Sequence, residues 1–342
     1  MALISGLSSA YGGSKPEPMP MVSEEIKWKI GKTMVYGTIT RPDDKKAHPA
    51  VLFIAGSGPT DRDWNSPLIP GTNGSGRLLA ENLASQGFVT LRYDKRISGT
   101  HAKDNFPYLI GQISMQSHFD EVEGAVNVLL SRADIDRARV FVLTNSEGAV
   151  HALNYQRQGE GTTFSRLILT GAPGRSIAEV AKTQIQTMCS ALPDSDKLME
   201  LYGKAVSDFE TGRAVEPDPA LPDEAKQLLL SLSAPANLPF ARELWDTDIS
   251  PWLHNTDKPV LVVIGKKDIQ VDYAIDGGRL EDAAKGKANI TFAYPENANH
   301  VLKYEQKPRT ELSPKDSLNY NAEGRTLDRD ALKAIVEFLG DR

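Results

Sequence analysis

The sequence predicts an α/β protein in which helices cover both faces of a mostly parallel central sheet. Two observations support this fold class. Short apolar segments, typical of buried strands, alternate along the chain with longer segments of helical periodicity, as in parallel strands joined by helices. One stretch, residues 176–254, interrupts this alternation because it contains helical segments only. We therefore expect one sheet-based core that carries an inserted helical cap.

The first elements are an N-terminal tail and a β-hairpin. Residues 1–22 show little pattern and are expected to be disordered. Residues 24–40 alternate apolar and polar positions on either side of Gly31-Lys32, which predicts two antiparallel strands. The strands expected next are residues 50–55, 88–93, 139–144, 166–170, 259–264 and 290–293, and the accompanying helices are residues 76–86, 115–132, 146–157, 275–284 and 328–339.

The inserted residues 176–254 are predicted to form a lid over the active site. Their helical stretches, residues 177–189, 195–210, 223–231 and 238–245, are separated by proline-rich turns. Ligands of open α/β sheets bind at the carboxyl ends of the strands, where we expect an insertion between two strands to lie. A subdomain that only adds stability or a dimer surface is the alternative. The core is then residues 23–175 and 255–342, and the candidate substrate-binding residues of the cap are Phe240 and Trp245.

The composition excludes several classes of function. The 342 residues include 39 basic and 45 acidic side chains, so the chain has a net charge of −6 and repels nucleic acid and anionic lipid. Cys189, the one cysteine, can form neither an internal disulfide nor a cluster of thiolate ligands. No apolar run reaches the roughly 18 residues of a membrane span. We expect a cytoplasmic protein that uses no cofactor or metal and acts on a small molecule. The sequence leaves open whether the protein forms a homo-oligomer.

Ser146 is the candidate nucleophile. It lies in Thr144-Asn145-Ser146-Glu147-Gly148, between an apolar strand and a helical segment. This is the pattern of a G-x-S-x-G nucleophile elbow with the first glycine replaced by threonine. In such an elbow a strained turn holds the serine Oγ away from its own backbone. A polar turn at the end of a strand is the alternative.

An aspartate and a histidine follow Ser146 in an order known for catalytic triads. A serine hydroxyl needs an adjacent base, and a histidine base needs a carboxylate that fixes its tautomer. Asp268 closely follows the apolar strand that ends at Gly265, with Asp272 as the alternative acid, and His300 follows the last expected strand. An ordinary loop histidine is the competing interpretation of His300. The other histidines fall in expected turns, helices or loops and are His48, His101, His118, His151 and His254.

With these segments the chain resembles the α/β-hydrolase superfamily, and within it the EstD-like bacterial esterases with a helical cap. The resemblance covers residue 49 to the C-terminus. It rests on the three triad segments and on Ala55-Gly-Ser-Gly-Pro-Thr-Asp-Arg-Asp63, Asn82-Leu-Ala-Ser-Gln-Gly-Phe88 and Leu91-Arg-Tyr-Asp-Lys-Arg96. The chain departs from the family where glycine is usual, at Trp64, Ile97 and Thr144.

The resemblance implies a serine hydrolase, most simply a carboxylesterase, with Ser146, Asp268 and His300 as its triad. The oxyanion of a tetrahedral intermediate needs two N–H donors. One is expected from the backbone of Glu147, at the start of the elbow helix, and the resemblance places the other at Ser57. The alternatives are a thioesterase, a lactonase, an amidase or peptidase, and a non-catalytic binding protein on the same fold.

Two further segments lie near the expected site. A dense set of opposite charges is predicted to brace the loops, and consists of Asp61, Arg62, Asp63, Arg92, Asp94 and Arg96. Residues 303–325 form a polar, irregular stretch that is long for a compact domain, which predicts a binding loop or a mobile flap. The glycine-rich residues 71–76 lack the lysine and the spacing of a phosphate-binding loop.

Overall fold

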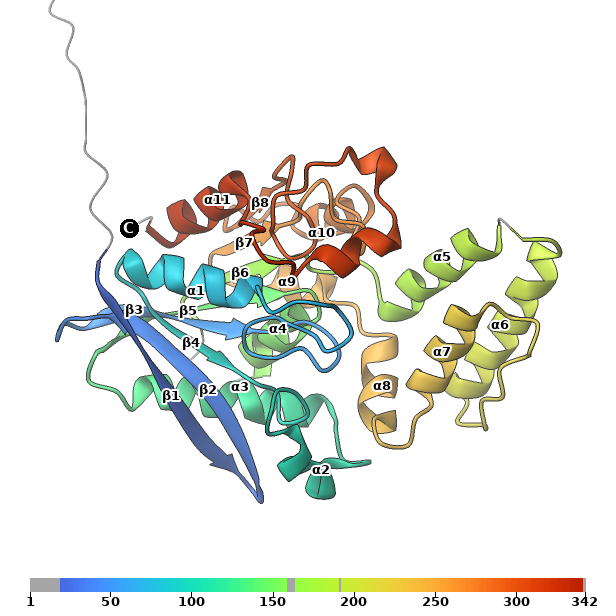
Figure 1. Ribbon diagram of the computed structural model, residues 1–342, viewed down its shortest axis with the longest axis horizontal. Coiled ribbons are helices and arrows are strands. Elements are labelled where there is room, and N and C mark those ends of the chain that lie inside the picture. The colour runs from blue at the N-terminus through green and yellow to red at the C-terminus, as the bar shows by residue number, and fades with distance from the viewer. Residues whose placement is uncertain (1–18, 159–163, 191, 341–342) are drawn as a thin grey trace, which may run out of the picture.

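A mostly parallel sheet of eight strands, covered by helices on both faces, confirms the expected α/β class (Figure 1). The computed structural model describes residues 19–158, 164–190 and 192–340. The strand order is β1-β2-β4-β3-β5-β6-β7-β8, and the pairs from β4 to β8 are parallel. The strands are Met21–Ile30, Thr33–Pro42, His48–Ile54, Val89–Tyr93, Ile135–Asn145, Arg166–Thr170, Val260–Val263 and Ile290–Ala293, numbered β1 to β8 in this order.

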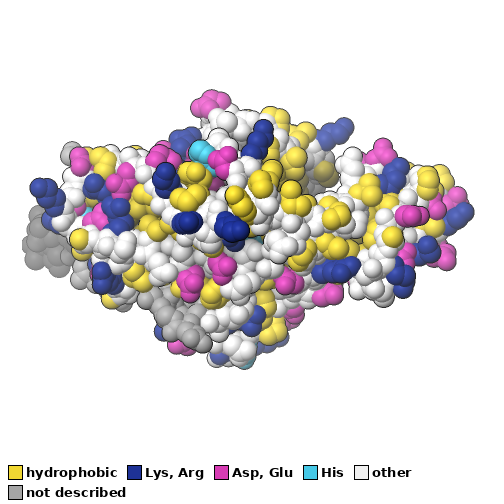
Figure 2. Space-filling view, turned by 90° about the horizontal axis from the view of Figure 1, so that it is seen from below, with side chains coloured by type: hydrophobic (Ala, Val, Ile, Leu, Met, Phe, Trp, Pro, Cys, Tyr) yellow, Lys and Arg dark blue, Asp and Glu magenta, His cyan; other side chains and the backbone are white. Residues whose placement is uncertain are grey.

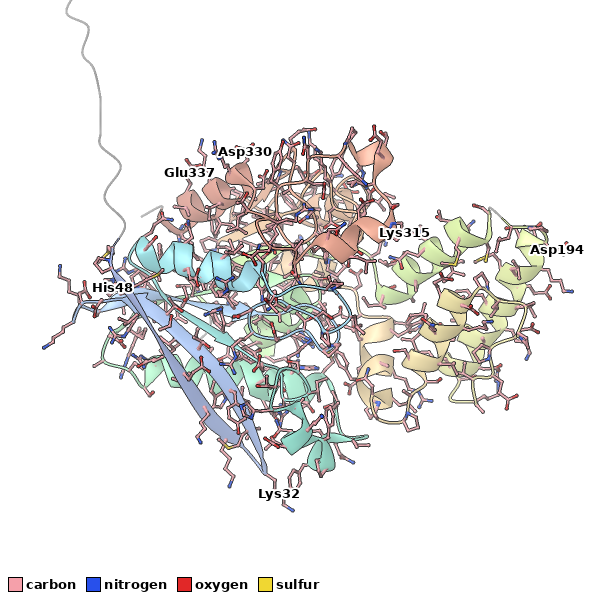
Figure 3. The ribbon with its side chains drawn as sticks, in the orientation of Figure 1. Lys32, His48, Asp194, Lys315, Asp330 and Glu337 are labelled. Atoms are coloured by element: carbon pink, nitrogen blue, oxygen red, sulfur yellow. The ribbon has the colours of Figure 1, made fainter. Side chains whose placement is uncertain are left out.

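The antiparallel hairpin β1–β2 forms one edge of the sheet, with Lys32 at its tip (Figure 3). Most of the tail expected at residues 1–22 lies outside the described residues. Its predicted end is wrong, because β1 begins at Met21, where the strand pairs with Pro42 at the end of β2. Pairing over the full length of both strands adds residues at each end of the hairpin that the alternation of side chains does not reveal.

The core consists of two apolar layers on opposite faces of the sheet. Neighbouring residues of β3 alternate between them: Val51 and Phe53 pack with α1 (Ser75–Ser85) and α11 (Arg329–Gly340), whereas Leu52 and Ile54 pack with α3 (Met115–Leu130) and α4 (Gly148–Gln158). Both faces of the strand are therefore apolar, as expected for a parallel sheet covered on both sides. The remaining helices of the core are α2 (Ala102–Leu109), which the sequence did not reveal, and α10 (Ile275–Ala283).

Between β6 and β7 the chain forms helices only, and α5 to α8 extend to one side of the sheet (Figure 1). This helical insertion consists of α5 (Ile177–Cys189), α6 (Ser195–Glu210), α7 (Asp223–Leu232), α8 (Leu238–Trp245) and the unpredicted α9 (Ser250–Asn255). Ile185 and Cys189 of α5 pack with Leu198 and Leu229 in a separate apolar cluster. A capping box between Ser176 and Glu179 fixes the start of α5.

The surface carries charged side chains of both signs, interspersed with apolar and neutral ones (Figure 2). Within the described residues, no helix is long and apolar enough to cross a membrane.

Candidate active site

The turn after β5 has the geometry of a nucleophile elbow. β5 ends at Asn145, α4 begins at Gly148, and Ser146 has a φ of +54°, a region that residues other than glycine seldom adopt. A Cβ atom at position 148 would lie 2.5 Å from the carbonyl oxygen of Ile54, which explains the glycine there. Thr144 does not disturb the turn, because it belongs to β5 and its hydroxyl donates to the carbonyl of Ile168 at 3.3 Å. Ser146 itself is partly exposed.

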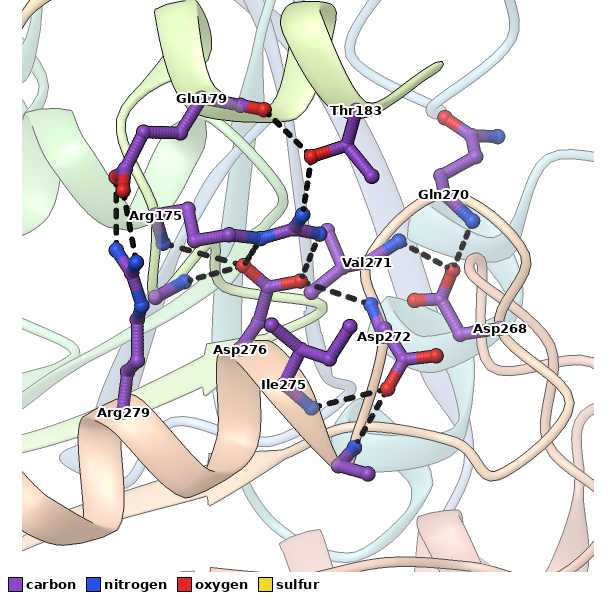
Figure 4. A network of polar contacts seen from close by, with 12 residues as sticks. Arg175, Glu179, Thr183, Asp268, Gln270, Val271, Asp272, Ile275, Asp276 and Arg279 are labelled. Carbon is purple, nitrogen blue, oxygen red and sulfur yellow. Dashed lines mark hydrogen bonds and ion pairs between the residues drawn. The ribbon is translucent and has the colours of Figure 1, made fainter. Parts of the chain in front are cut away.

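Asp268 and His300 are joined by a hydrogen bond of 2.8 Å between Oδ2 and Nδ1. The other carboxylate oxygen of Asp268 accepts from the backbone N–H groups of Gln270 and Val271, at 2.8 and 2.9 Å (Figure 4). The Asn145 side chain donates to the carbonyl of His300 at 3.0 Å. Both the ring and the backbone of His300 are therefore held in place, next to the elbow.

The alternative acid, Asp272, has other partners. One of its carboxylate oxygens accepts from the N–H groups of Ala274 and Ile275, and the other pairs with Arg309 at 2.6 Å. Arg309 also donates to the carbonyls of Lys266 and Asp268, so it braces the loop that carries Asp268. The structure thus brings Asp268, rather than Asp272, to His300.

Ser146 and His300 line one cavity of about 170 Å³. Ser57 lines the same cavity, and in the described part of the chain its backbone N–H and that of Glu147 donate to no other protein atom. Two N–H groups thus remain available next to Ser146, as an oxyanion would require. No hydrogen bond within the described residues joins the Oγ of Ser146 to His300, and such bonds often shorten only when substrate is bound.

Phe240 and Trp245 line a neighbouring cavity of about 240 Å³, together with Ser57 and Glu147. They are absent from the walls of the cavity that contains Ser146. Phe240 packs edge-on against His118, with ring centroids 4.6 Å apart. Trp245 packs against Phe209 and donates its indole N–H to Glu210 at 3.0 Å. Both residues therefore line a cavity that shares Ser57 with the Ser146 cavity, and neither lines the Ser146 cavity itself.

The walls of the Ser146 cavity come instead from two loops. Residues 57–69 form one wall, and Tyr320 and Asn321, from the long stretch 303–325, form another. This stretch is anchored by Lys303, whose buried ammonium donates to the carbonyls of Asn73 and Tyr320. Burial lowers the pKa of Lys303 to about 8. The polar, irregular composition of this stretch predicts a binding loop or a mobile flap, and two of its residues, Tyr320 and Asn321, line the cavity.

Trp64 is part of the first wall and shows why glycine is usual at this position. It is buried, yet it has a φ of +66°. The Asp61 carboxylate holds this turn, because it accepts from the backbone N–H groups of Asp63 and Asn65, each at 2.9 Å. Residues other than glycine are strained in this conformation, by roughly 1–3 kcal/mol. The indole packs on Phe53, which helps to hold it in place.

The charges predicted to brace the loops form two pairs and one unexpected contact. Arg62 pairs with Asp94 at 2.7 Å, and Arg92 pairs with Asp63. Arg96 pairs instead with Glu121 of α3, at 3.0 Å, so it belongs to a different group of buried side chains.

That group is a buried cluster behind the elbow, formed by Lys95, Arg96, His118, Glu121, Glu147 and His151, and the sequence predicts a site role for only one of these residues, the backbone N–H of Glu147. His118 contacts Glu121 at 3.0 Å, His151 contacts Glu147 at 3.2 Å, and Lys95 lies 3.8 Å from Glu147. Burial and the nearby His118 lower the pKa of His151 to about 4. Burial opposes ionisation of Glu147, but Lys95 and His151 outweigh it and lower the pKa of that carboxyl to about 2. The spacings i,i+3 and i,i+4 were the only signal in the sequence.

This cluster predicts that acid destabilises the fold. Between about pH 6.5 and pH 4, the unfolded chain binds a proton at His151 that the folded chain does not, so the free energy of unfolding falls as pH falls. Between about pH 7.5 and pH 5, the free energy of unfolding of the His151→Gln variant should fall by about 2 kcal/mol less than that of the wild type. Urea unfolding at both pH values measures this difference, and equal losses would contradict the proposed burial of a neutral His151.

Another buried ion pair, between Arg175 and Asp276, fixes the base of the helical insertion. Asp276 of α10 is fully buried and contacts the Arg175 guanidinium at 3.0 and 2.8 Å, while it also accepts from the backbone N–H groups of Gly174, Arg175 and Asp272 (Figure 4). Arg279 and Glu179 form an exposed pair nearby. The two pairs allow the effect of burial to be tested on one segment.

We expect Asp276→Ala to lower the free energy of unfolding by about 3–5 kcal/mol, because Arg175 would stay buried without its partner. Arg279→Ala should cost about 1 kcal/mol or less, because both of the groups in that pair are already hydrated. Urea unfolding of both variants measures the contrast. Similar losses would mean that the buried pair contributes no more than a surface pair.

The described residues contain no group of three or more His, Cys, Asp or Glu side chains placed to hold a metal ion. No model of a protein family matches the chain. It is 27% identical over 269 residues to esterase EstD of Thermotoga maritima, an alignment that covers 78% of this chain and 57% of the esterase. The chain thus spans little more than half the length of this relative.

Solved structures establish the fold. The α/β hydrolase GrgF from Penicillium sp. sh18 aligns with a TM-score of 0.56 at 12% identity, over 93% of this chain and 98% of its own. A putative dienelactone hydrolase from Klebsiella pneumoniae aligns with a TM-score of 0.52 at 10% identity, over 94% of this chain and 100% of its own. A bromoperoxidase from Bacillus anthracis aligns with a TM-score of 0.52 at 14% identity, over 93% of this chain and 100% of its own. The α/β-hydrolase fold expected from the sequence is confirmed.

Proposed function

We propose that this α/β-hydrolase-fold chain is a serine carboxylesterase that cleaves small to medium esters through an acyl-enzyme intermediate. The observation that carries the proposal is the arrangement of Ser146 and His300 in one cavity, with His300 held by the buried Asp268. Ser146 attacks the ester carbonyl while His300 takes the serine proton, which it then donates to the leaving alcohol. Asp268 fixes the His300 tautomer and stabilises the imidazolium.

The proposal assigns the oxyanion to the backbone N–H groups of Ser57 and Glu147. Each donor of this kind is worth roughly 3–4 kcal/mol of transition-state stabilisation. Similarity to an esterase favours an ester over a thioester, a lactone or an amide as the substrate. A non-catalytic binding protein on the same fold is the candidate from another class, and it predicts an unreactive Ser146.

Labelling with a small alkyl fluorophosphonate tests the proposal, combined with pH-stat assays of simple aliphatic esters, thioesters and lactones. We expect one label, mapped to Ser146 by peptide mass spectrometry, and fastest turnover of the esters. Absence of the label, or a label on another serine, would refute the proposed nucleophile. Faster turnover of thioesters or lactones would correct the substrate class and leave the triad in place.

The acyl chain is proposed to lie past Ser57, in the cavity that Phe240 and Trp245 line. Phe240→Ala should then change the ratio of kcat/KM between long and short acyl esters by about tenfold, since one or two methylene contacts are worth about 1–3 kcal/mol. Methyl esters of unbranched acids measure this ratio, in which any loss of folded protein cancels. Equal loss on every chain length would leave Phe240 a packing residue only.

A further inference from the structure

The wall of the Ser146 cavity has a buried part and an exposed part. Trp64, Tyr320 and Asn321 are buried and close part of its wall. Gln270 and Leu68, which also line it, are exposed. The exposed part of the wall thus includes Gln270, on the loop that carries Asp268.

A much larger groove, of about 820 Å³, adjoins the Ser146 cavity at this exposed part. It shares Ile69 and Gln270 with the Ser146 cavity and lies between α5 and the segment 309–317. Its volume is in the range of typical ligand pockets, roughly 300–1,000 Å³. Figure 3 shows Lys315, on the 3-10 helix Pro314–Asn319, on the side of the core that faces α5.

Helix α5 presents two different faces. Ala181, Ile185 and Cys189, spaced four residues apart, are buried against the other helices of the insertion. The neighbouring face lines the groove with Val180, Thr183, Gln184, Thr187 and Met188. The same helix thus contributes to the fold of the insertion and, with a second set of residues at helical spacing, to the groove.

The groove offers no free charge from its arginines. Arg175 is paired with Asp276, and Arg309 with Asp272. Apolar side chains from both walls, Ile69, Val180, Ile269 and Ile275, remain available for contact. This lining fits an uncharged, extended chain better than an anion.

The chemistry of the triad decides which part of the ester lies there. His300 must reach the leaving oxygen, so the alcohol extends from Ser146 toward His300 and the Asp268 loop. Ile269, Gln270 and Asp272 of that loop line the groove. The acyl part then extends in another direction, past Ser57.

We propose that the groove between α5 and the segment 309–317 is the alcohol subsite, and that it binds the unbranched apolar chain of esters of long primary alcohols. This inference rests on the proposed function of Ser146, Asp268 and His300. In this proposal α5 determines which alcohol group of the ester is preferred, whereas Phe240 and Trp245 line the cavity proposed for the acyl chain.

Two substitutions of glutamine by aspartate on α5 test the proposal. Gln184 lines the groove, whereas Gln186 is exposed and lies outside it. Gln184→Asp and Gln186→Asp therefore change the charge and the helix equally, and only the first variant places a carboxylate in the groove. Val180→Asp serves as a second groove variant. The substrates are acetates of unbranched alcohols from methyl to octyl and methyl esters of unbranched acids, both followed by pH-stat.

In the wild type we expect kcat/KM to rise along the acetate series, by up to about fourfold for each buried methylene. Gln184→Asp and Val180→Asp should reduce the octyl to methyl ratio by about tenfold or more, and Gln186→Asp should leave it unchanged. A flat acetate series in the wild type, equal effects of the two glutamine variants, or an effect on the acid series alone would overturn the inference. Failure of the wild type to hydrolyse any ester would refute the proposed function instead.

Discussion

Ser146→Ala is expected to lower kcat/KM for simple esters by about 10³-fold or more, without loss of stability. In the proposed mechanism this side chain supplies the nucleophile, and removal of a nucleophile leaves only the contribution of the oxyanion site and of binding. The fold should tolerate the change because the N–H of Ser146, which donates to the carbonyl of Thr170 at 2.8 Å, is retained. Alanine also occupies the same strained φ region at a similar cost.

Progress curves for methyl and ethyl esters, with urea unfolding as the control for folding, measure this prediction. The variant should also fail to react with the fluorophosphonate. Activity at a tenth of the wild-type level in a variant free of wild-type protein would show that another group is the nucleophile.

The sequence alone predicts which polar residues follow the parallel strands of the sheet. Ser146 follows β5, Asp268 follows β7, and His300 follows β8. The carboxyl ends of parallel strands lie at one edge of a sheet, so residues far apart in the chain meet there once the strand order is set. The contact between His300 and Asp268 follows from this rule and from the chemistry of the triad.

Contacts between loops and helices could not be predicted in this way. The strained backbone of Trp64 depends on the Asp61 carboxylate and on packing against Phe53. The pair of Arg175 and Asp276 joins residues 101 positions apart, and neither has a local pattern that identifies the other. The cavity that Phe240 and Trp245 line could not be located from the sequence either, because helical periodicity shows that a helix has an apolar face and not which neighbour that face contacts.

The departures from glycine also became clear only in three dimensions. At Thr144 a strand residue is compatible with the turn, because the positive φ falls on Ser146. At Trp64 the positive φ falls on the departing residue itself, and the surrounding loop supports it. Positions where glycine is usual thus indicate a turn in which one residue has a positive φ, and the structure shows which residue that is.

His300→Ala is expected to reduce kcat as strongly as Ser146→Ala, and the double variant should be no less active than either single variant, because the two residues act as one unit in the proposed mechanism. A triad serine without its base keeps only the rate supplied by binding and by the oxyanion donors. Both single variants and the double variant can be compared by pH-stat at high enzyme concentration. Additive losses would indicate that Ser146 and His300 act in separate steps.

Asp268→Asn should lose somewhat less activity than His300→Ala but far more than Asp272→Asn. Asparagine at position 268 can still accept from Gln270 and Val271, so the loop should keep its shape while the charge beside His300 is lost. Asp272 pairs with Arg309 and two backbone N–H groups, so its replacement should affect mainly stability. Both variants lack one carboxylate of the same loop, and only Asp268 contacts His300. The ratio of the two kcat values therefore measures the contribution of that contact. Equal or greater loss at position 272, with the Asp268 variant active, would move the acid role to Asp272.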